Sequence, residues 1–177
     1  MIFRLAEERD FSGFIGLAAE VEQWFGAMVE EPGFHGAVRE HIRRGAALVA
    51  VSGAGVVGGL LFGGGAPVFR VHWLVVSEAA RGQGVGQALM AEAEERFVRG
   101  RGAGCVEVVT FGADHPGAVA GGARVFYERL GFTPAEAAPP GPEGGSRQVF
   151  RRAVGEPGGP GERGEQGGPG EQGGPGE

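Results

Sequence analysis

A dense glycine cluster between an apolar segment and a helix-patterned segment constrains the fold most. The apolar segment, FRVHWLVV at residues 69–76, is the nearly continuous run of β-forming residues expected of a strand covered on both faces. After the cluster at residues 81–86, Leu89, Ala93 and Phe97 recur every fourth residue, as in an amphipathic helix. A strand, a glycine-rich turn and a helix in this order leave several backbone N–H groups free at the helix start, all pointing the same way.

The ligand that suits such a turn is a phosphate or a pyrophosphate. The positive end of the helix dipole lies behind the free N–H groups, and Gly82, Gly84 and Gly86 lack the β-carbons that would keep an anion away. The dinucleotide fingerprint Gly-x-Gly-x-x-Gly does not fit, because the residue three places after Gly86 is Leu89. A P-loop is excluded because the chain contains no lysine. Because 38 of the 177 residues are glycine, a glycine cluster by itself says little in this chain. The interpretation rests on the strand before the cluster and the helix after it.

The C-terminal residues differ in composition from the rest of the chain. From Gly155 to Gly176 every third residue is glycine, which is the collagen register, and no aliphatic or aromatic side chain is present. Seven triplets are few for a triple helix, so we predict a disordered tail, with a trimerising collagen-like segment as the alternative. We expect one domain over residues 1–154 and a low-complexity tail over residues 155–177.

Charge and cysteine content restrict the classes of function. The tail carries five Glu and one Arg, so it holds most of the net charge of −6, and the nearly neutral body argues against nucleic-acid binding. The single cysteine, Cys105, excludes an internal disulfide and a multi-cysteine metal site. The start, MIFRLAEERDF, lacks the basic-then-apolar order of a signal peptide. We therefore expect a cytoplasmic protein rather than a secreted structural protein organised by the tail.

Residues 45–69 carry no charge and are long enough for a membrane span. Glycines in the middle and at the end of the segment, together with Pro67, favour two short strands instead. We predict a hairpin of ALVAVS and VVGGLLF with a turn at residues 53–55, and no membrane association.

The remaining segments alternate between strand and helix patterns. Strands are expected at residues 2–6, 105–111 and 146–154, and helices at residues 11–25 after an N-cap at Asp10, at 34–44, and from Ala123 to Leu130 before a glycine cap at Gly131. Strand, helix and strand in succession imply a right-handed crossover between parallel neighbours. The fold class is α/β, a single domain with a mixed twisted sheet of about six to seven strands and about four helices.

Two sequence blocks resemble one known family. Arg-x-x-Gly-x-Gly, here Arg81, Gly84 and Gly86, follows WLVVSEAA and resembles the acyl-CoA pyrophosphate loop of the GNAT superfamily of N-acetyltransferases. ARVFYERLGF, residues 123–132, is similar to the family's later helix, in which a Tyr lies four residues before the Gly of a closing Leu-Gly-Phe. The blocks come in the family's order with a strand between them, and the resemblance spans about residues 2–154.

The resemblance implies an acetyl-CoA-dependent N-acetyltransferase that moves the acetyl group to a primary amine of a small molecule or peptide, by direct attack in a ternary complex. It implies neither a metal nor a covalent enzyme intermediate, and it is compatible with a homodimer. Tyr127 matches the general acid that protonates the thiolate of coenzyme A, the alternative being a core tyrosine on an amphipathic helix. Backbone groups at the strand end would bind the pantetheine arm and the loop would bind the pyrophosphate. The implied cofactor-binding residues are Leu74, Val75, Val76, Arg81, Gly82, Gln83, Gly84, Val85, Gly86 and Gln87.

Two features depart from the family pattern and leave the general base open. Many members carry an Asn seven residues before the Tyr, where this chain has Ala120, and the segment GADHPGAVAGG is longer than usual. Glu107, Asp114, His115 or water are the candidate bases, although Asp114 and His115 equally suit a turn residue and a surface histidine. His72 in the cofactor strand is predicted to be packed rather than catalytic. The departures keep a non-catalytic acyl-CoA-binding or sensing module as the alternative function.

The sequence says least about the acceptor. In the family, the two early helices and their connection cover it, and here they contribute Trp24, Phe25, Glu30 and Glu31. Aromatic walls beside carboxylates suit a cationic amine. A core Trp and Phe with a solvated acidic turn is an equal alternative.

Overall fold

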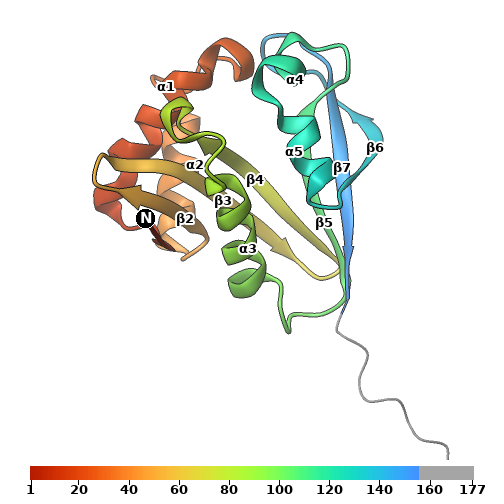
Figure 1. Cartoon of the computed structure of the whole chain (residues 1–177), viewed down its shortest axis with the longest axis horizontal. Coiled ribbons are helices and arrows are strands. Elements are labelled where there is room, and N and C mark those ends of the chain that lie inside the picture. The colour runs from red at the N-terminus through yellow and green to blue at the C-terminus, as the bar shows by residue number, and fades with distance from the viewer. Residues whose placement is uncertain (156–177) are drawn as a thin grey trace, which may run out of the picture.

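The computed structural model describes residues 1–155 (Figure 1). Apart from Gly155, the predicted tail lies outside the described residues, and the expected domain boundary after residue 154 stays a prediction. The elements in chain order are β1 (Ile2–Leu5), η1 (Glu8–Asp10), α1 (Phe11–Phe25), α2 (Pro32–Arg43), β2 (Ala47–Ser52), β3 (Gly55–Gly65), β4 (Val68–Val76), η2 (Glu78–Ala80), α3 (Val85–Phe97), β5 (Gly104–Phe111), α4 (Pro116–Gly121), α5 (Ala123–Arg129), β6 (Thr133–Ala138) and β7 (Arg147–Val154), where η1 and η2 are short 3₁₀ helices.

One seven-stranded sheet, in the order β1-β2-β3-β4-β5-β7-β6, forms the middle layer. Among the six neighbouring pairs in residues 1–155, β4 and β5 are parallel and the other five pairs are antiparallel. The connection from β4 to β5 runs through α3, as expected for parallel neighbours. The predicted fold class is confirmed, with a mixed sheet of seven strands and five α-helices within residues 1–155.

Different helices cover the two faces of the sheet (Figure 1). On one face, α3 and α5 pack on the sheet in the larger core cluster, which includes Leu89, Met90 and Phe150. On the other face, α1 and α2 cover β2, β3 and β4 in clusters around Phe14 and Leu17. Because β4 contributes to clusters on both faces, it is covered on both sides, as its composition predicts.

The uncharged segment at residues 45–69 forms the predicted hairpin. It contains β2 and β3 and runs into the start of β4. Within residues 1–155, no helix combines the length and the apolarity that a membrane crossing requires.

A bulge in β4 shapes the middle of the sheet. Leu61 of β3 pairs with Trp73, but the next residue, Phe62, pairs with Val71, so His72 is an additional residue in β4. An added residue bends the strand and increases its local twist. The pairing of β4 with β5 ends at Val71 opposite Val108, and the strands diverge beyond that point (Figure 1).

Several local expectations are corrected. Asp10 precedes α1 as predicted, but its carboxylate does not cap the helix; it accepts hydrogen bonds from Arg4 and from the amide of Glu7. α2 begins at Pro32, two residues before the expected start at residue 34, since the first helical turn does not need the missing N–H of proline. The short elements α4 and β6 lie in segments without a recognisable period.

The predicted glycine cap of the last helix is confirmed. Gly131 follows α5 with a positive φ of 87°, and the amides of Gly131 and Phe132 donate to the carbonyls of Glu128 and Tyr127. This double hydrogen bond is the Schellman arrangement, which fixes the direction of the chain after α5.

Candidate active site

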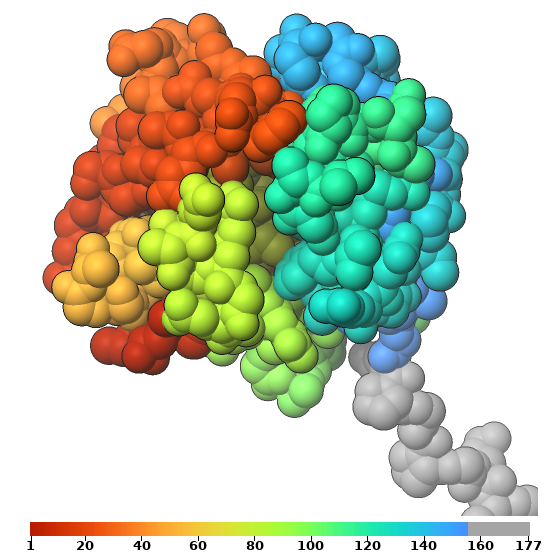
Figure 2. All heavy atoms as spheres, turned by 45° about the horizontal axis from the view of Figure 1, so that its top comes forward, coloured from red at the N-terminus to blue at the C-terminus, as the bar shows by residue number. Residues whose placement is uncertain are grey.

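A cleft of about 650 Å³ opens where β4 and β5 separate. Figure 2 shows the face hollowed between the segment around residues 75–90 and the segment around residues 120–130, with the end of α1 above. Nine of the ten predicted cofactor-binding residues and Tyr127 line this cleft, namely Leu74, Val75, Val76, Arg81, Gly82, Gly84, Val85, Gly86, Gln87 and Tyr127.

The end of β4 forms the first wall of the cleft. Its last residues, Leu74–Val76, pair with β3 on one side but have no partner strand on the side of β5. Backbone polar groups on that side are therefore available to a ligand. Arg81 lies at the end of this wall, where its Nε donates to the carbonyl oxygen of Val76 at 3.2 Å.

The glycine-rich loop and the start of α3 form the second wall. Gly82 and Gly84 have φ values of 74° and 77°, which only glycine adopts without strain. The first amide to bond back toward the helix start is that of Ala88, which donates to Gly84 at 3.0 Å. The N–H groups of residues 85–87 consequently have no intrahelical acceptor, which is the geometry that binds phosphate.

Two residues of the loop have roles that differ from the expectation. Gln83 does not line the cleft; its amide nitrogen donates to the carbonyl of Ala79 at 3.2 Å. A β-carbon added to Gly86 would lie 3.1 Å from the ring of Phe126. Gly86 therefore allows α3 and α5 to approach each other, in addition to keeping the helix start open.

Glu20 of α1 holds this loop from across the fold, and sequence reasoning missed it. Its Oε1 accepts from the Ser77 hydroxyl at 2.9 Å and its Oε2 accepts from the Glu78 amide at 2.8 Å. Glu20 thus caps the short helix η2 that leads from β4 into the glycine loop. No local signal identifies it, because the partners lie 57 and 58 residues away in the chain.

Tyr127 of α5 lies both in the core and at the cleft. It is only 5% exposed and packs edge-on against the rings of Phe126, Phe132 and Phe150 in the larger core cluster, yet it also lines the cleft. Burial raises the pKa of its hydroxyl well above the usual range. The hydroxyl therefore stays protonated and makes no hydrogen bond to any group within residues 1–155.

The sequence model of a family described as the acetyltransferase (GNAT) domain matches residues 43–134, just over half of the chain. The chain belongs to the GNAT acetyltransferase family. The match begins at the end of α2 and ends at the start of β6, so it contains the whole cleft apart from the contribution of α1.

Solved structures share the GNAT fold with this chain at low sequence identity. Ribosomal-protein-alanine N-acetyltransferase from Brucella melitensis is 18% identical with a TM-score of 0.66, over 87% of this chain and 100% of that one. Ard1 from Thermoplasma volcanium is 18% identical with a TM-score of 0.67, over 86% and 97%. PaiA N-acetyltransferase from Thermoplasma acidophilum, solved with coenzyme A, is 15% identical with a TM-score of 0.65, over 86% and 98%. No curated protein matches the chain.

Two of the candidate bases of this GNAT domain have structural roles outside the cleft. Ser146 donates its hydroxyl hydrogen to Asp114, which lowers the pKa of that carboxyl and makes it a weaker base. His115 is buried rather than at the surface; its Nδ1 accepts from the amide of Gly117 at 2.8 Å, which caps α4, and its ring stacks on Phe111. Neither Asp114 nor His115 lines the cleft.

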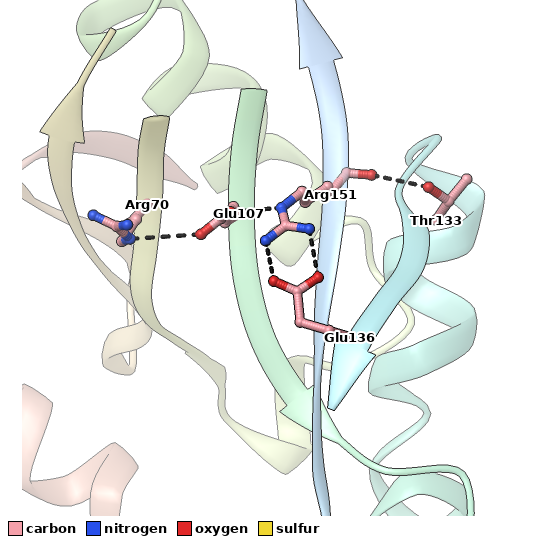
Figure 3. A network of polar contacts seen from close by, with 5 residues as sticks. All are labelled: Arg70, Glu107, Thr133, Glu136 and Arg151. Atoms are coloured by element: carbon pink, nitrogen blue, oxygen red, sulfur yellow. Dashed lines mark hydrogen bonds and ion pairs between the residues drawn. The ribbon is translucent and has the colours of Figure 1, made fainter. Parts of the chain in front are cut away.

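Glu107, the third candidate, belongs to an ion-pair network with Arg70, Arg151 and Glu136 (Figure 3) and does not line the cleft. Its Oε1 accepts from Nε of Arg151 at 2.6 Å, and its Oε2 lies 3.6 Å from Nε of Arg70. Arg151 also binds the carboxylate of Glu136 on β6, which lowers the pKa of Glu136. Both oxygens of Glu107 thus face guanidinium groups.

The aromatic residues of α1 lie at the cleft, but the acidic residues do not. Trp24 and Phe25 line it, and the ring of Phe25 lies 4.9 Å from that of Phe111 between centroids. Glu30 and Glu31 are exposed in the connection to α2 and take no part in the lining. The interpretation of aromatic walls beside carboxylates is therefore wrong for this cleft.

Proposed function

We propose that the chain is an acetyl-CoA-dependent N-acetyltransferase that acts on a primary amine of a small molecule or peptide. The observation that carries the proposal is the arrangement of one cleft, in which a free strand end, free helix amides and the hydroxyl-bearing ring of Tyr127 face the same space. Membership of the GNAT family supports it. PaiA N-acetyltransferase and an aminoglycoside 6'-N-acetyltransferase, both solved with coenzyme A, support acetyl-CoA as the co-substrate.

Each part of the cleft has a task in binding acetyl-CoA. The amides at residues 82–87 bind the pyrophosphate, since they combine free N–H groups with the positive end of the α3 dipole. The backbone of Leu74–Val76 hydrogen-bonds the amide groups of the pantetheine arm in place of a neighbouring strand. Arg81 and Glu20 hold the loop in the required shape from its two sides.

The reaction is a direct acyl transfer. The amine nitrogen bonds to the thioester carbonyl carbon, the carbon–sulfur bond breaks, and the thiolate receives the hydroxyl proton of Tyr127. Because burial keeps Tyr127 protonated, it remains a hydrogen-bond donor until negative charge develops on sulfur. The larger contribution to the rate comes from holding two bound reactants in line.

A non-catalytic acyl-CoA-binding module is the second candidate. The observation that favours it is the cleft lining, which within residues 1–155 contains no carboxylate and no histidine to act as a base.

Calorimetry with acetyl-CoA, followed by a turnover assay over a panel of amines, separates the two candidates. We expect binding together with release of free coenzyme A for at least one amine among amino acids, polyamines, aminoglycosides and protein N-termini. Binding without turnover across the panel supports the module, and absence of binding contradicts both candidates.

A further inference from the structure

The cleft is lined from both faces of the sheet. Leu74 and Val76 of its β4 wall pack with the core cluster on the face of α3 and α5. Val75, between them, packs with Val21 of α1 on the other face, and both of these residues line the cleft as well. Figure 2 shows the end of α1 directly above the hollow. Because the free amides of the glycine-rich loop lie at the start of α3, the space beside α1 is left for the second substrate.

Aromatic rings form the end of the cleft beside α1. Trp24 and Phe25, the last two residues of α1, line it and are only partly buried. The ring of Phe25 lies 4.9 Å from that of Phe111, the last residue of β5, between centroids. Phe111 is 4% exposed and also stacks on the ring of His115, so its position is fixed by packing. The three rings therefore present an apolar surface against which an aromatic or aliphatic group can pack.

The charged side chains of the lining are both positive. Across residues 1–155 they are Arg81, beside the glycine-rich loop, and Arg129 of α5, and the lining includes no carboxylate. It includes no histidine from that range either; His72 of β4, which the sequence predicts to be packed, is exposed with its ring against that of His41. A second ammonium group on the acceptor would lose its water beside α1 without gaining a negative partner, which is costly.

The carboxylates of α1 and of the loop before β7 are bound to other groups. Glu20 holds the turn after β4, and Oε2 of Glu22 accepts from the amide of Met28 at 3.3 Å. Oε1 of Glu143, in the loop between β6 and β7, lies 3.5 Å from Nε2 of His115. None of these three carboxylates lines the cleft, so none of them is placed to bind a polycationic acceptor there.

We propose that the acceptor is a small primary amine joined to one aromatic or apolar group, with no second positive charge, and that Trp24 and Phe25 select it. The inference rests on the proposed acetyltransferase function and names its substrate class. Apolar surroundings disfavour the charged form of an ammonium group and lower its pKa. An amine held between the rings therefore releases its proton to solvent and presents the neutral nitrogen that can attack a thioester.

The test uses two amines of similar length, phenethylamine, which carries a ring, and cadaverine, which carries a second ammonium group. For the full chain, kcat/KM is measured for each amine with acetyl-CoA, and calorimetry gives the affinity of each amine for the complex with coenzyme A. We expect kcat/KM to be at least about 100-fold higher for phenethylamine, because the second charge of cadaverine is desolvated without a partner.

Two glutamate variants and one alanine variant test the named residues. Trp24→Glu adds a carboxylate to the lining, whereas the matched control Gln23→Glu adds it at an exposed neighbour that does not line the cleft. Trp24→Glu should reduce the preference for phenethylamine over cadaverine about tenfold, and Gln23→Glu should leave it unchanged. Phe25→Ala should raise the KM for phenethylamine about tenfold while the affinity for acetyl-CoA stays within about twofold.

The possible results separate the substrate class from the acetyltransferase function. A preference for cadaverine, or an equal shift in both glutamate variants, overturns the substrate class but leaves the function in place. If phenethylamine binds the coenzyme A complex through Trp24 and Phe25 but no amine is acetylated, the function fails and the aromatic binding site is still supported. If neither amine binds or reacts, the inference is overturned.

Discussion

Val71 and Val108 form the last residue pair that joins β4 to β5, and the two strands separate beyond it. β4 continues to Val76 and β5 to Phe111, so the cleft walls are strand ends that lack a partner on one side. Unpaired backbone groups are costly when buried and so require water or a ligand. The point where β4 and β5 separate is therefore a gap in the sheet. A ligand with amide groups can form the most hydrogen bonds to unpaired backbone groups there.

Tyr127 is the proposed proton donor to the coenzyme A thiolate. Tyr127→Phe should lower kcat about 100-fold, since the thiolate loses its proton donor, whereas the affinity for acetyl-CoA should change less than twofold. The free energy of unfolding should fall by less than about 1 kcal/mol, because the Tyr127 hydroxyl has no hydrogen-bond partner within residues 1–155. Steady-state kinetics, calorimetry and thermal unfolding measure the three quantities. An unchanged kcat would reduce Tyr127 to a core residue.

Glu20 is expected to set the shape of the cofactor loop. Glu20→Gln removes the charge from both hydrogen bonds to Ser77 and Glu78 and replaces one accepting oxygen by an NH2 group, so it should raise the KM for acetyl-CoA about tenfold, with a smaller effect on kcat. Gln23→Ala, an exposed change on the same helix, is the control. Equal values of KM for both variants would show that the loop holds its shape without α1.

Two glycine-to-alanine variants distinguish a glycine with a positive φ from a glycine in ordinary helical backbone. Gly84→Ala forces a φ of 77° on a side-chain-bearing residue, so it should cost about 1–2 kcal/mol of stability and weaken acetyl-CoA binding. Gly16→Ala in α1 has nothing within 4 Å of the added carbon and should stabilise the chain by about 0.5–1 kcal/mol. Urea unfolding and calorimetry give both numbers; tight binding by Gly84→Ala would contradict the assigned loop geometry.

The ion pair between Arg4 and Asp10 should make the free energy of unfolding depend on pH in the acidic range. Burial opposes the ionisation of Asp10, but the hydrogen bonds from Arg4 and from the Glu7 amide overcome it and lower its pKa below the ordinary 3.8. A lowered folded-state pKa stabilises the fold above pH 3.8, and this contribution is lost as the pH falls through the folded-state value. Urea unfolding at several pH values measures the loss.

Asp10→Asn should cost about 2 kcal/mol at pH 7 and flatten this acid dependence, because a partly buried Arg4 loses its counter-charge. Glu95→Gln, which breaks an exposed pair with Arg99, should cost less than about 0.5 kcal/mol. An unchanged acid limb in Asp10→Asn would show that other carboxylates set the acid stability.

Patterns within short stretches identified most of the elements and much of the cleft. The hairpin at β2 and β3, the helix α3 and the glycine cap at Gly131 all followed from local propensity, period and backbone preference. The segment of β6, TPAEAA, has neither alternation nor β-branched residues beyond Thr133, so its strand depends on pairing with β7. His115 could not be placed either, since its burial depends on Phe111 and the loop before β7.

The sequence by itself determined most of the strands and helices and their order, the glycine-rich turn between β4 and α3, and the position of Tyr127 on its helix. The tertiary structure alone decided where β4 and β5 separate and that Glu20 holds the loop. It also brought the rings of His41 and His72 into hydrogen-bond contact. The division has a physical reason. Turn geometry and helix periodicity are set by neighbours a few residues apart, whereas these contacts join side chains 31 and 57 positions apart, which meet only after the sheet and helices have packed.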